Sequence, residues 1–317
     1  MRSPRTRSSN DSCQRSKSPE ATTAMTSTEA LKQIRRIQLV STRMATSIFA
    51  GEYQSVFKGK GIEFEELREY QPGDDIRTID WNVTARSSRP FVRQFVEERE
   101  LTVMIMLDIS PSLSFGTHHG LKSRTAAEVS ALLAGAALRN NDKLGLILFT
   151  DRIERYIPPR KGNRHLFKMI REALFLKPVG TGTDIAGALE YLNRIMKRSA
   201  VVFLISDCYA PEFTTPLMMA QARHDLVAVA ITDPAEIDLP EVGLIKLDDA
   251  ETGKSTLVDT SDPEVRRQYH RNGVMLREER RRLFRSAGTD YVEITPEASY
   301  LQTLVGFFRR RGRRLRR

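Results

Sequence analysis

The sequence predicts an α/β fold, in which a mainly parallel, Rossmann-like sheet carries helices on both faces and follows a small N-terminal β subdomain. From residue 101 onward, apolar segments of strand length alternate with segments of helical periodicity, which indicates βαβ units. Several strand segments, such as residues 101–107 and 201–206, are continuous apolar runs. Runs of this kind are typical of strands that are buried on both faces of a parallel sheet.

The elements follow one another in a regular order along the second part of the chain. Predicted strands cover residues 101–107, 144–150, 153–157, 201–206, 226–232 and 291–294. Predicted helices cover residues 124–139, 164–174, 184–196, 212–223, 263–286 and 299–311, and a short strand or a hairpin is predicted within residues 243–259. Because most strands are joined through helices, right-handed crossovers should place them parallel to one another in a single sheet.

The first hundred residues have a different character. Residues 1–27 are rich in Ser, Thr and Arg and lack hydrophobic periodicity, which predicts a disordered basic leader. Residues 29–49 carry a roughly helical apolar stripe, and short β segments with turns, one of them at Ser87 and Ser88, follow it. The predicted division is a leader (1–27), a helix and β subdomain (28–100), an α/β domain (101–260), a C-terminal extension (261–308) and an Arg-rich tail (309–317).

The net charge of +10 is concentrated at the two ends of the 317-residue chain. Residues 1–27 carry a net +3 and residues 309–317 a net +7, so the body between them is formally neutral. This distribution argues against specific nucleic-acid binding, although an arginine tail can contact phosphate or an anionic membrane surface weakly. No apolar segment reaches the roughly 20 residues of a membrane span. The leader has no secretory apolar region and Cys13 and Cys208 predict no disulfide, so we expect a cytoplasmic location.

Small oxygen-bearing side chains follow three predicted elements where parallel strands should end. Asp108, Ser110 and Ser112 follow the first strand, Thr183 lies in a Gly-rich loop that enters a helix, and Asp207 follows the strand of residues 201–206. The carboxyl ends of parallel strands are where open α/β sheets bind ligands. Carboxylate and hydroxyl oxygens suit Mg²⁺, which prefers near-octahedral oxygen coordination. The pattern therefore predicts a site for a hard cation, with one position left for a ligand.

These residues carry a resemblance to known families. The pattern Asp108-x-Ser110-x-Ser112, a later threonine (Thr183) and a late aspartate (Asp207) resembles the metal-ion-dependent adhesion site of von Willebrand factor A domains. The preceding segment is similar to the signature of the domain of unknown function 58 family of bacterial proteins. Its recognisable parts are Gly59-x-Gly61, Glu69-Tyr70, Pro72-Gly73-Asp74-Asp75, Arg77, Ile79-Asp80-Trp81 and Thr84-Ala85-Arg86.

The resemblance implies a von Willebrand factor A-like fold and association with MoxR-type AAA+ ATPases. It also implies that Asp108, Ser110, Ser112, Thr183 and Asp207 hold the cation, Mg²⁺ or Mn²⁺, directly or through water. A carboxylate of the partner then completes the coordination shell. Many members of the family begin with two membrane helices, and this chain resembles the shorter kind that lacks them.

Two interpretations of the signature segment remain open. Its polar residues could form an ion-pair network that pins the β subdomain to the sheet, with Trp81 as a buried anchor, or they could form a docking surface for a partner. The residues concerned are Asp74, Asp75, Arg77, Asp80, Trp81 and Arg86.

The functional prediction is a cytoplasmic, non-enzymatic adaptor that binds an acidic side chain of a MoxR-type ATPase or of its client, in protein assembly or maturation. One alternative is a metal-dependent hydrolase or phosphatase, although Ser110 stands where a haloacid-dehalogenase-like phosphatase has its second carboxylate. The G-x-S-x-G elbow and the nucleotide-binding glycine motifs are also absent. The other alternative is a nucleic-acid or membrane-surface binder that acts through the Arg-rich tail.

Overall fold

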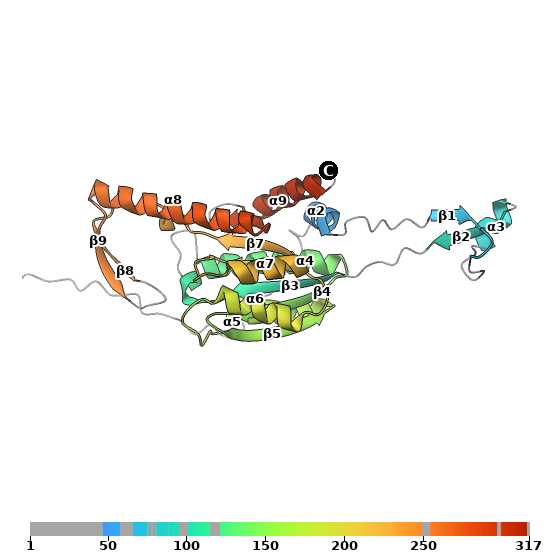
Figure 1. Cartoon of the computed structure of the whole chain (residues 1–317), viewed down its shortest axis with the longest axis horizontal. Helices are drawn as coiled ribbons and strands as arrows, with labels where there is room; N and C mark the ends of the chain where they lie inside the picture. Colours follow the sequence, from blue (N-terminus) through green and yellow to red (C-terminus); the bar gives the residue numbers. More distant parts are fainter. Residues whose placement is uncertain are drawn as a thin grey trace, which may run out of the picture.

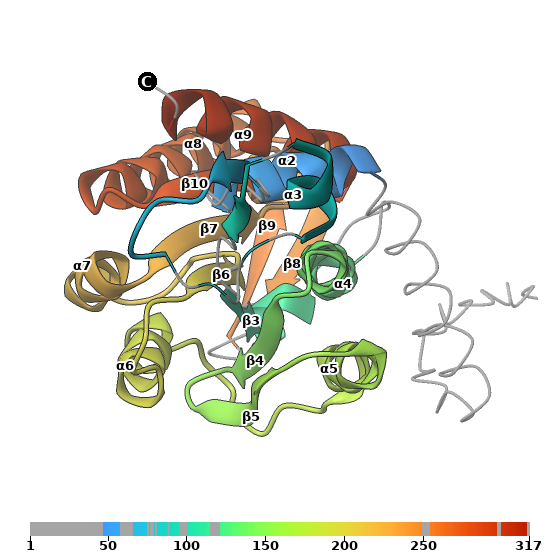
Figure 2. The ribbon, with the colours of Figure 1, turned by 90° about the vertical axis from the view of Figure 1, so that its right-hand side faces the viewer.

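A computed structural model describes most of the chain from residue 47 onward. The described residues are 47–57, 66–74, 76, 79, 81–87, 89–94, 101–114, 121–248, 254–296 and 299–315. The predicted leader and most of the predicted helix of residues 29–49 lie outside this part. Within it, the chain folds around one six-stranded sheet with helices packed on both of its faces (Figures 1 and 2).

The sheet has the strand order β10-β7-β6-β3-β4-β5. Its strands are β3 (Thr102–Asp108), β4 (Lys143–Phe149), β5 (Ile153–Arg160), β6 (Val201–Ser206), β7 (Asp225–Ile231) and β10 (Asp290–Ile294). Neighbouring strands are parallel, apart from the antiparallel pair of β4 and the edge strand β5. The predicted α/β fold with a mainly parallel sheet is therefore confirmed, and it is consistent with a von Willebrand factor A-like fold.

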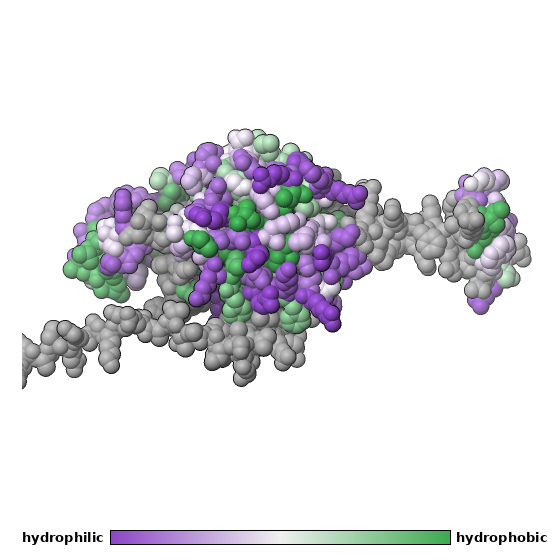
Figure 3. Space-filling model, turned by 90° about the horizontal axis from the view of Figure 1, so that it is seen from below, coloured by the Kyte–Doolittle hydropathy of each residue, from purple (hydrophilic) through white to green (hydrophobic). Residues whose placement is uncertain are grey.

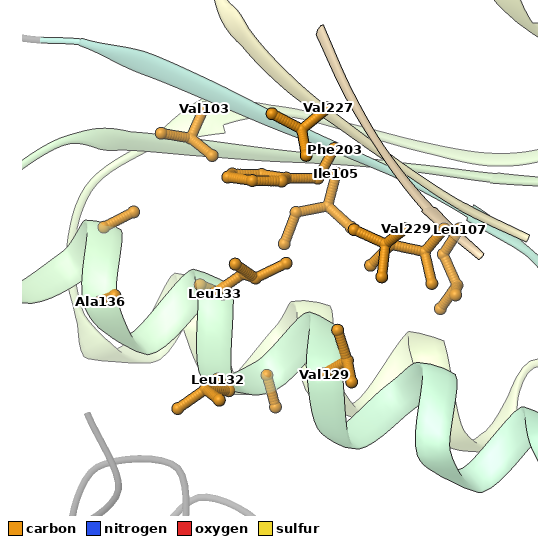
Figure 4. Close-up of a cluster of buried hydrophobic side chains, with 14 of the residues drawn as sticks. Val103, Ile105, Leu107, Val129, Leu132, Leu133, Ala136, Phe203, Val227 and Val229 are labelled. Atoms are coloured by element: carbon orange, nitrogen blue, oxygen red, sulfur yellow. The ribbon is translucent and has the colours of Figure 1, made fainter. Parts of the chain in front are cut away.

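Helices α4 (Lys122–Arg139) and α5 (Asn163–Phe175) cover one face of the sheet, and α6 (Ile185–Ile195) and α7 (Thr214–Arg223) cover the other (Figure 2). The side chains of β3 alternate between the two layers that result. Val103, Ile105 and Leu107 pack toward α4, as Figure 4 shows, whereas Met104 and Met106 belong to the core on the opposite face. Burial on both faces explains why this strand is an unbroken apolar run.

A long helix and a hairpin project beyond the sheet (Figure 1). Helix α8 (Pro263–Ser286) follows the antiparallel hairpin of β8 (Leu244–Asp248) and β9 (Ser255–Asp259). Apolar side chains of the hairpin are exposed (Figure 3), and Leu244 and Leu257 are 73% and 74% accessible to solvent. None of the helices in the described ranges has the length and apolar character that a bilayer crossing requires.

The C-terminal helix α9 (Tyr300–Leu315) packs against α2 (Ser47–Phe57) on the same side of the sheet as α4. The rings of Phe49 and Phe308 lie 5.5 Å apart between the two helices, and both side chains are fully buried. The helix continues through most of the predicted Arg-rich tail of residues 309–317, as far as residue 315. Arg311 is buried and pairs with Asp225 and Asp290, because the apolar face of α9 carries this arginine onto the sheet.

The signature segment contains more helix than the sequence predicts. Strands β1 (Glu66–Glu69) and β2 (Phe91–Gln94) form an antiparallel pair. The helix α3 (Trp81–Ser87) lies between them, where the sequence predicted short β segments and a turn at Ser87 and Ser88. Trp81 is 67% exposed, which contradicts the one of the two open interpretations in which it is a buried anchor. Asp74 accepts a hydrogen bond from the Gln71 N–H and closes a turn. The side chain of Arg86 is exposed, and Asp75, Arg77 and Asp80 lie outside the described residues.

Candidate functional site

The candidate site lies at the carboxyl ends of β3 and β6, where the order of the strands in the sheet reverses relative to their order in the chain. From β3 the chain continues to β4 on one side, while β6, which comes later, pairs with the other side of β3. Leu107 and Ile205 are partners in the register of the β3–β6 pair, so Asp108 and Asp207 both leave the sheet at its carboxyl edge. Open α/β sheets bind their ligands at such a switch point, because the loops diverge there and leave a crevice.

Asp108 ends β3 with a carboxylate that is only 1% exposed. One of its oxygens accepts a hydrogen bond of 2.8 Å from the Ser110 N–H, and the other accepts one of 2.6 Å from the Ser206 hydroxyl. The hydroxyl oxygens of Ser110 and Ser112 lie 2.9 Å apart at the start of the 3₁₀ turn η2 (Pro111–Ser114). The aspartate and the two serines are therefore brought together by local turn chemistry.

Asp207 leaves β6 through a sharp turn. Cys208, which follows it, has a φ of 60°, and its N–H donates a hydrogen bond of 2.9 Å to the Ser206 hydroxyl. A left-handed conformation is uncommon for a residue other than glycine, so surrounding contacts must hold it in place. The Asp207 carboxylate is 1% exposed, and the Tyr209 N–H donates to its Oδ1 over 3.3 Å. The turn thus buries a second carboxylate at the same edge.

The loop that carries Thr183 is fastened to the end of β4. The Asp184 N–H donates a hydrogen bond of 2.9 Å to the Thr150 carbonyl, and Glu154 accepts the Gly180 N–H over 2.7 Å. A Cβ atom at Gly180 would lie 2.1 Å from the Thr150 hydroxyl, so only glycine permits this close approach. Thr183 is 6% exposed at the edge of the sheet where β3 and β6 end. All five predicted ligands are therefore at this edge.

The electrostatics of Asp108 set it apart from the other carboxyl groups of the edge. Burial raises the pKa of Asp108, and the negative charge of Asp207 raises it further, to about 7 from an ordinary value of 3.8. The hydrogen bonds from Ser206 and Ser110 oppose this rise but do not cancel it. Among the described residues, no lysine or arginine forms an ion pair with Asp108. A buried carboxylate in this position is stabilised by a cation.

Three residues of the site have no signal in the local sequence. The ammonium group of Lys122, the first residue of α4, lies 3.0 Å from Asp207 Oδ2 and 2.5 Å from Glu236 Oε1. Glu236 ends the 3₁₀ turn η3 (Pro234–Glu236), which follows β7. Arg280 of α8 donates a hydrogen bond of 2.6 Å to the Asp207 carbonyl. Burial by itself lowers the pKa of Lys122, but Asp207 and Glu236 outweigh it, so the pKa is raised and the group stays charged.

The donor set determines which metals fit the site. Within the described ranges, no three side chains of histidine, cysteine, aspartate or glutamate are arranged to hold a metal ion. The two buried carboxylates and three hydroxyls are all oxygen donors, the ligand type that Mg²⁺ and Mn²⁺ prefer. Cys208 adds no reactive thiolate, because burial raises its pKa to about 12.

Comparison with known proteins places this chain in a family. Residues 66–279, more than half of the chain, match the family described as "Protein of unknown function DUF58". The chain belongs to this family. The matched region includes β3, β6, the loop after β3, the first residue of α4, the loop of Thr183 and the turn η3, and it ends one residue before Arg280 of α8.

The relatives that match by sequence are described as uncharacterized proteins. Uncharacterized proteins of Mycobacterium bovis and Mycobacterium tuberculosis are 32% identical to the chain over 284 residues, which cover 88% of this chain and 89% of theirs. The uncharacterized protein YeaD of Bacillus subtilis is 26% identical over 105 residues, which cover 33% of this chain and 24% of that protein.

Solved structures are more distant. A conserved hypothetical protein BatB from Bacteroides thetaiotaomicron aligns with a TM-score of 0.42 at 17% identity, over 67% of this chain and 99% of that one. A mussel byssus protein described with a zinc-occupied MIDAS motif aligns with a TM-score of 0.33 at 14% identity, over 42% of this chain and 38% of that one.

Proposed function

We propose that this protein is a non-enzymatic interaction protein that binds a carboxylate of its partner through a divalent cation, Mg²⁺ or Mn²⁺, at the carboxyl edge of the sheet. The observation that carries the proposal is the buried carboxylate of Asp108. It pairs with no cationic side chain among the described residues and is repelled by Asp207. A divalent cation between the two groups would remove this repulsion and recover the cost of burying both charges.

Each residue of the site has a defined part in this proposal. Asp108 and Asp207 supply negative charge, and the hydroxyls of Ser110, Ser112 and Thr183 complete the set of protein oxygens. The hydrogen bonds from Ser206 and the Ser110 N–H hold Asp108 in one orientation before any ligand arrives. When bound, the cation supplies a positive charge that attracts the carboxylate of a partner.

The direct test is a calorimetric titration of Mn²⁺ into the full-length protein and into Asp108→Asn. We expect one site in the wild type and at least a hundredfold loss of affinity in the variant, because the substitution removes one of two charged ligands. Asp238→Asn is the matched control, since Asp238 is 72% exposed and pairs with His270 away from Asp108. Equal Mn²⁺ affinity in the wild type and in Asp108→Asn would refute the proposed site.

The partner is proposed from the resemblance of the sequence to the domain of unknown function 58 family, which implies association with MoxR-type AAA+ ATPases. We propose that such an ATPase, or its client, provides the carboxylate in the cytoplasm. The test is binding of the purified ATPase to the immobilised protein in Mg²⁺ and in a chelator. Retention that requires both Mg²⁺ and Asp108 supports the proposal, and retention that is equal in chelator contradicts the metal bridge.

A hydrolase or phosphatase remains the alternative of a different class, and a rate measurement separates it from an adaptor. On our proposal, p-nitrophenyl phosphate in Mg²⁺ is not hydrolysed above the rate of the Asp108→Asn variant. Turnover that Asp108→Asn abolishes would instead identify Asp108 as part of an active site.

A further inference from the structure

A buried lysine stands beside the candidate cation site. Lys122 contributes its ammonium group from the first residue of α4 to Asp207 at 3.0 Å and to Glu236 at 2.5 Å. The side chains of Lys122 and Asp207 are 3% and 1% exposed, and that of Glu236 is 15% exposed. An ion pair with this degree of burial is only weakly screened by water and salt.

The structure holds this lysine and its partners in place. The Tyr269 hydroxyl of α8 donates a hydrogen bond of 3.0 Å to the Ala235 carbonyl, next to Glu236. Helix α8 crosses this turn closely at Gly273, where a Cβ atom would lie 2.8 Å from the Glu236 carbonyl oxygen. These contacts fix the position of the Glu236 backbone. They therefore also limit the movement of the Glu236 carboxylate, which pairs with Lys122 as Asp207 does.

The position of Lys122 divides the two oxygens of Asp207 between different tasks. Lys122 pairs with Oδ2, whereas Oδ1, as far as the described residues go, accepts the longer hydrogen bond from the Tyr209 N–H. A second cation at this edge would therefore approach Asp207 through Oδ1, on the side of the carboxylate that Lys122 does not hold. The fixed positive charge on Oδ2 repels that cation, and in a buried site the repulsion is large.

We propose that Lys122 is a built-in counter-cation that limits the affinity of the site for a divalent ion and, once the ion is bound, raises the affinity of the site for a carboxylate. This inference rests on the proposed function, because it concerns the same cation. Its physical basis is one of charge. Lys122 cancels part of the negative charge that attracts the metal, so the loaded site keeps more positive charge for an anionic partner. Metal capture and partner binding then support each other.

Two substitutions change the charge in opposite directions and so test the inference. Lys122→Met removes the positive charge, whereas Glu236→Gln removes one of the two negative charges with which Lys122 forms ion pairs. Lys168→Met is the control, because it removes the same charge from an exposed position on α5. Mn²⁺ affinity is measured for each full-length protein by water-proton relaxation, and acetate is then titrated into the Mn²⁺-loaded forms.

We expect Lys122→Met to bind Mn²⁺ at least about tenfold more tightly than the wild type, and Glu236→Gln to bind it more weakly. The order should reverse for acetate, with Glu236→Gln the tightest and Lys122→Met the weakest, while Lys168→Met matches the wild type in both. If Lys122→Met does not fold, as judged by circular dichroism, Glu236→Gln decides the question alone.

Two results separate the role of Lys122 from the metal site itself. Mn²⁺ binding that depends on Asp108 but is no weaker in Glu236→Gln than in the wild type, or no tighter in folded Lys122→Met, overturns the role of Lys122 and leaves the metal site standing. Absence of Asp108-dependent Mn²⁺ binding in every form, including Lys122→Met, overturns both.

Discussion

The two edges of the central sheet each bury a cation between two carboxylates, yet they differ in one respect. At the amino edge, Arg311 of α9 pairs with Asp225 and Asp290, which begin β7 and β10. At the carboxyl edge, Lys122 pairs with Asp207 and Glu236. The carboxyl edge also holds Asp108, a further buried carboxylate that no lysine or arginine of the described residues pairs with.

This difference separates a structural cluster from a candidate ligand site. The Asp290 carboxylate receives a second guanidinium from Arg314, so the charges of the amino edge are met within the chain. The planar guanidinium of Arg311 can serve two carboxylates at once, which makes it suited to fasten α9 to the sheet. At the carboxyl edge, no lysine or arginine of the described residues balances the charge of Asp108 in this way. A similar ion-pair pattern therefore leaves different charge at the two edges, and we propose that a cation balances it at the carboxyl edge.

The largest change in stability is expected when the ion pairs of Arg311 at the amino edge are removed. Arg311→Met should lower the free energy of unfolding by about 3 to 5 kcal/mol, because it leaves Asp225 and Asp290 without their shared cation. It also removes the contact of the guanidinium with the Phe57 ring, 4.7 Å from its centroid. Urea denaturation measures the loss, and Mn²⁺ affinity should stay unchanged. A loss below about 1 kcal/mol would show that the cluster is not what fastens α9.

The next effect concerns the charge of Asp108 in the metal-free protein. Folding raises its pKa from 3.8 to about 7, so the folded protein binds more protons than the unfolded chain between these values. The stability that Asp108 contributes is therefore fully present below about pH 4 and is lost as the pH rises through about 7, by on the order of 4 kcal/mol in total.

Urea denaturation in a chelator between pH 4.5 and 7.5 measures this dependence. Asp108→Asn should show a flatter profile than the wild type, because its side chain does not titrate. Parallel profiles for the wild type and Asp108→Asn would mean that folding does not raise the pKa of Asp108.

A smaller effect comes from ligand binding itself. Mg²⁺ at about thirty times its Kd should stabilise the wild type by about 2 kcal/mol, since it binds the folded state alone. The increase in Tm should disappear in Asp108→Asn and persist in Arg311→Lys, which changes only the amino edge. Thermal unfolding followed by circular dichroism measures both. The same increase in Asp108→Asn would place the ion elsewhere.

The smallest effect is expected at Arg309, two residues before Arg311 on the same helix. Arg309 pairs with Glu52 over 2.8 Å but is 52% exposed, so water and salt screen the pair. Arg309→Met should change the free energy of unfolding by less than about 1 kcal/mol. The ratio of the losses in unfolding free energy caused by Arg311→Met and Arg309→Met, measured in one urea series, shows how much burial adds to the stabilisation by an arginine ion pair. Equal effects would contradict the comparison between the two clusters.

Most of the strands and helices of the sheet were predictable from the sequence, because each is defined by its own periodicity. Residues 201–206 and 263–286, for example, are a strand and a helix with the predicted bounds. The five predicted ligands were recognisable for a related reason. They follow strand ends or a glycine loop, and the carboxyl ends of parallel strands meet at one edge. Whether they bind a metal remains a prediction.

The helix of residues 300–315 extends beyond residue 311, the predicted end of the last helix. Residues 309–317, which carry seven arginines, were expected to form an Arg-rich tail. The helical signal reaches into this tail, because Leu304, Phe307, Phe308 and Arg311 follow one another at helical spacing. The long aliphatic stem of an arginine can continue an apolar face when carboxylates receive its head group.

The sequence by itself determined the α/β class, the order of the strands along the chain and the oxygen-bearing residues at their ends, since these depend on periodicity and on neighbouring residues. Only the tertiary structure decided which charges meet. Lys122 and Glu236 are 114 residues apart, and Arg311 and Asp225 are 86 residues apart. No local pattern marks such pairs, because the free energy that selects them arises from burial, and burial exists only once the sheet and its helices have packed.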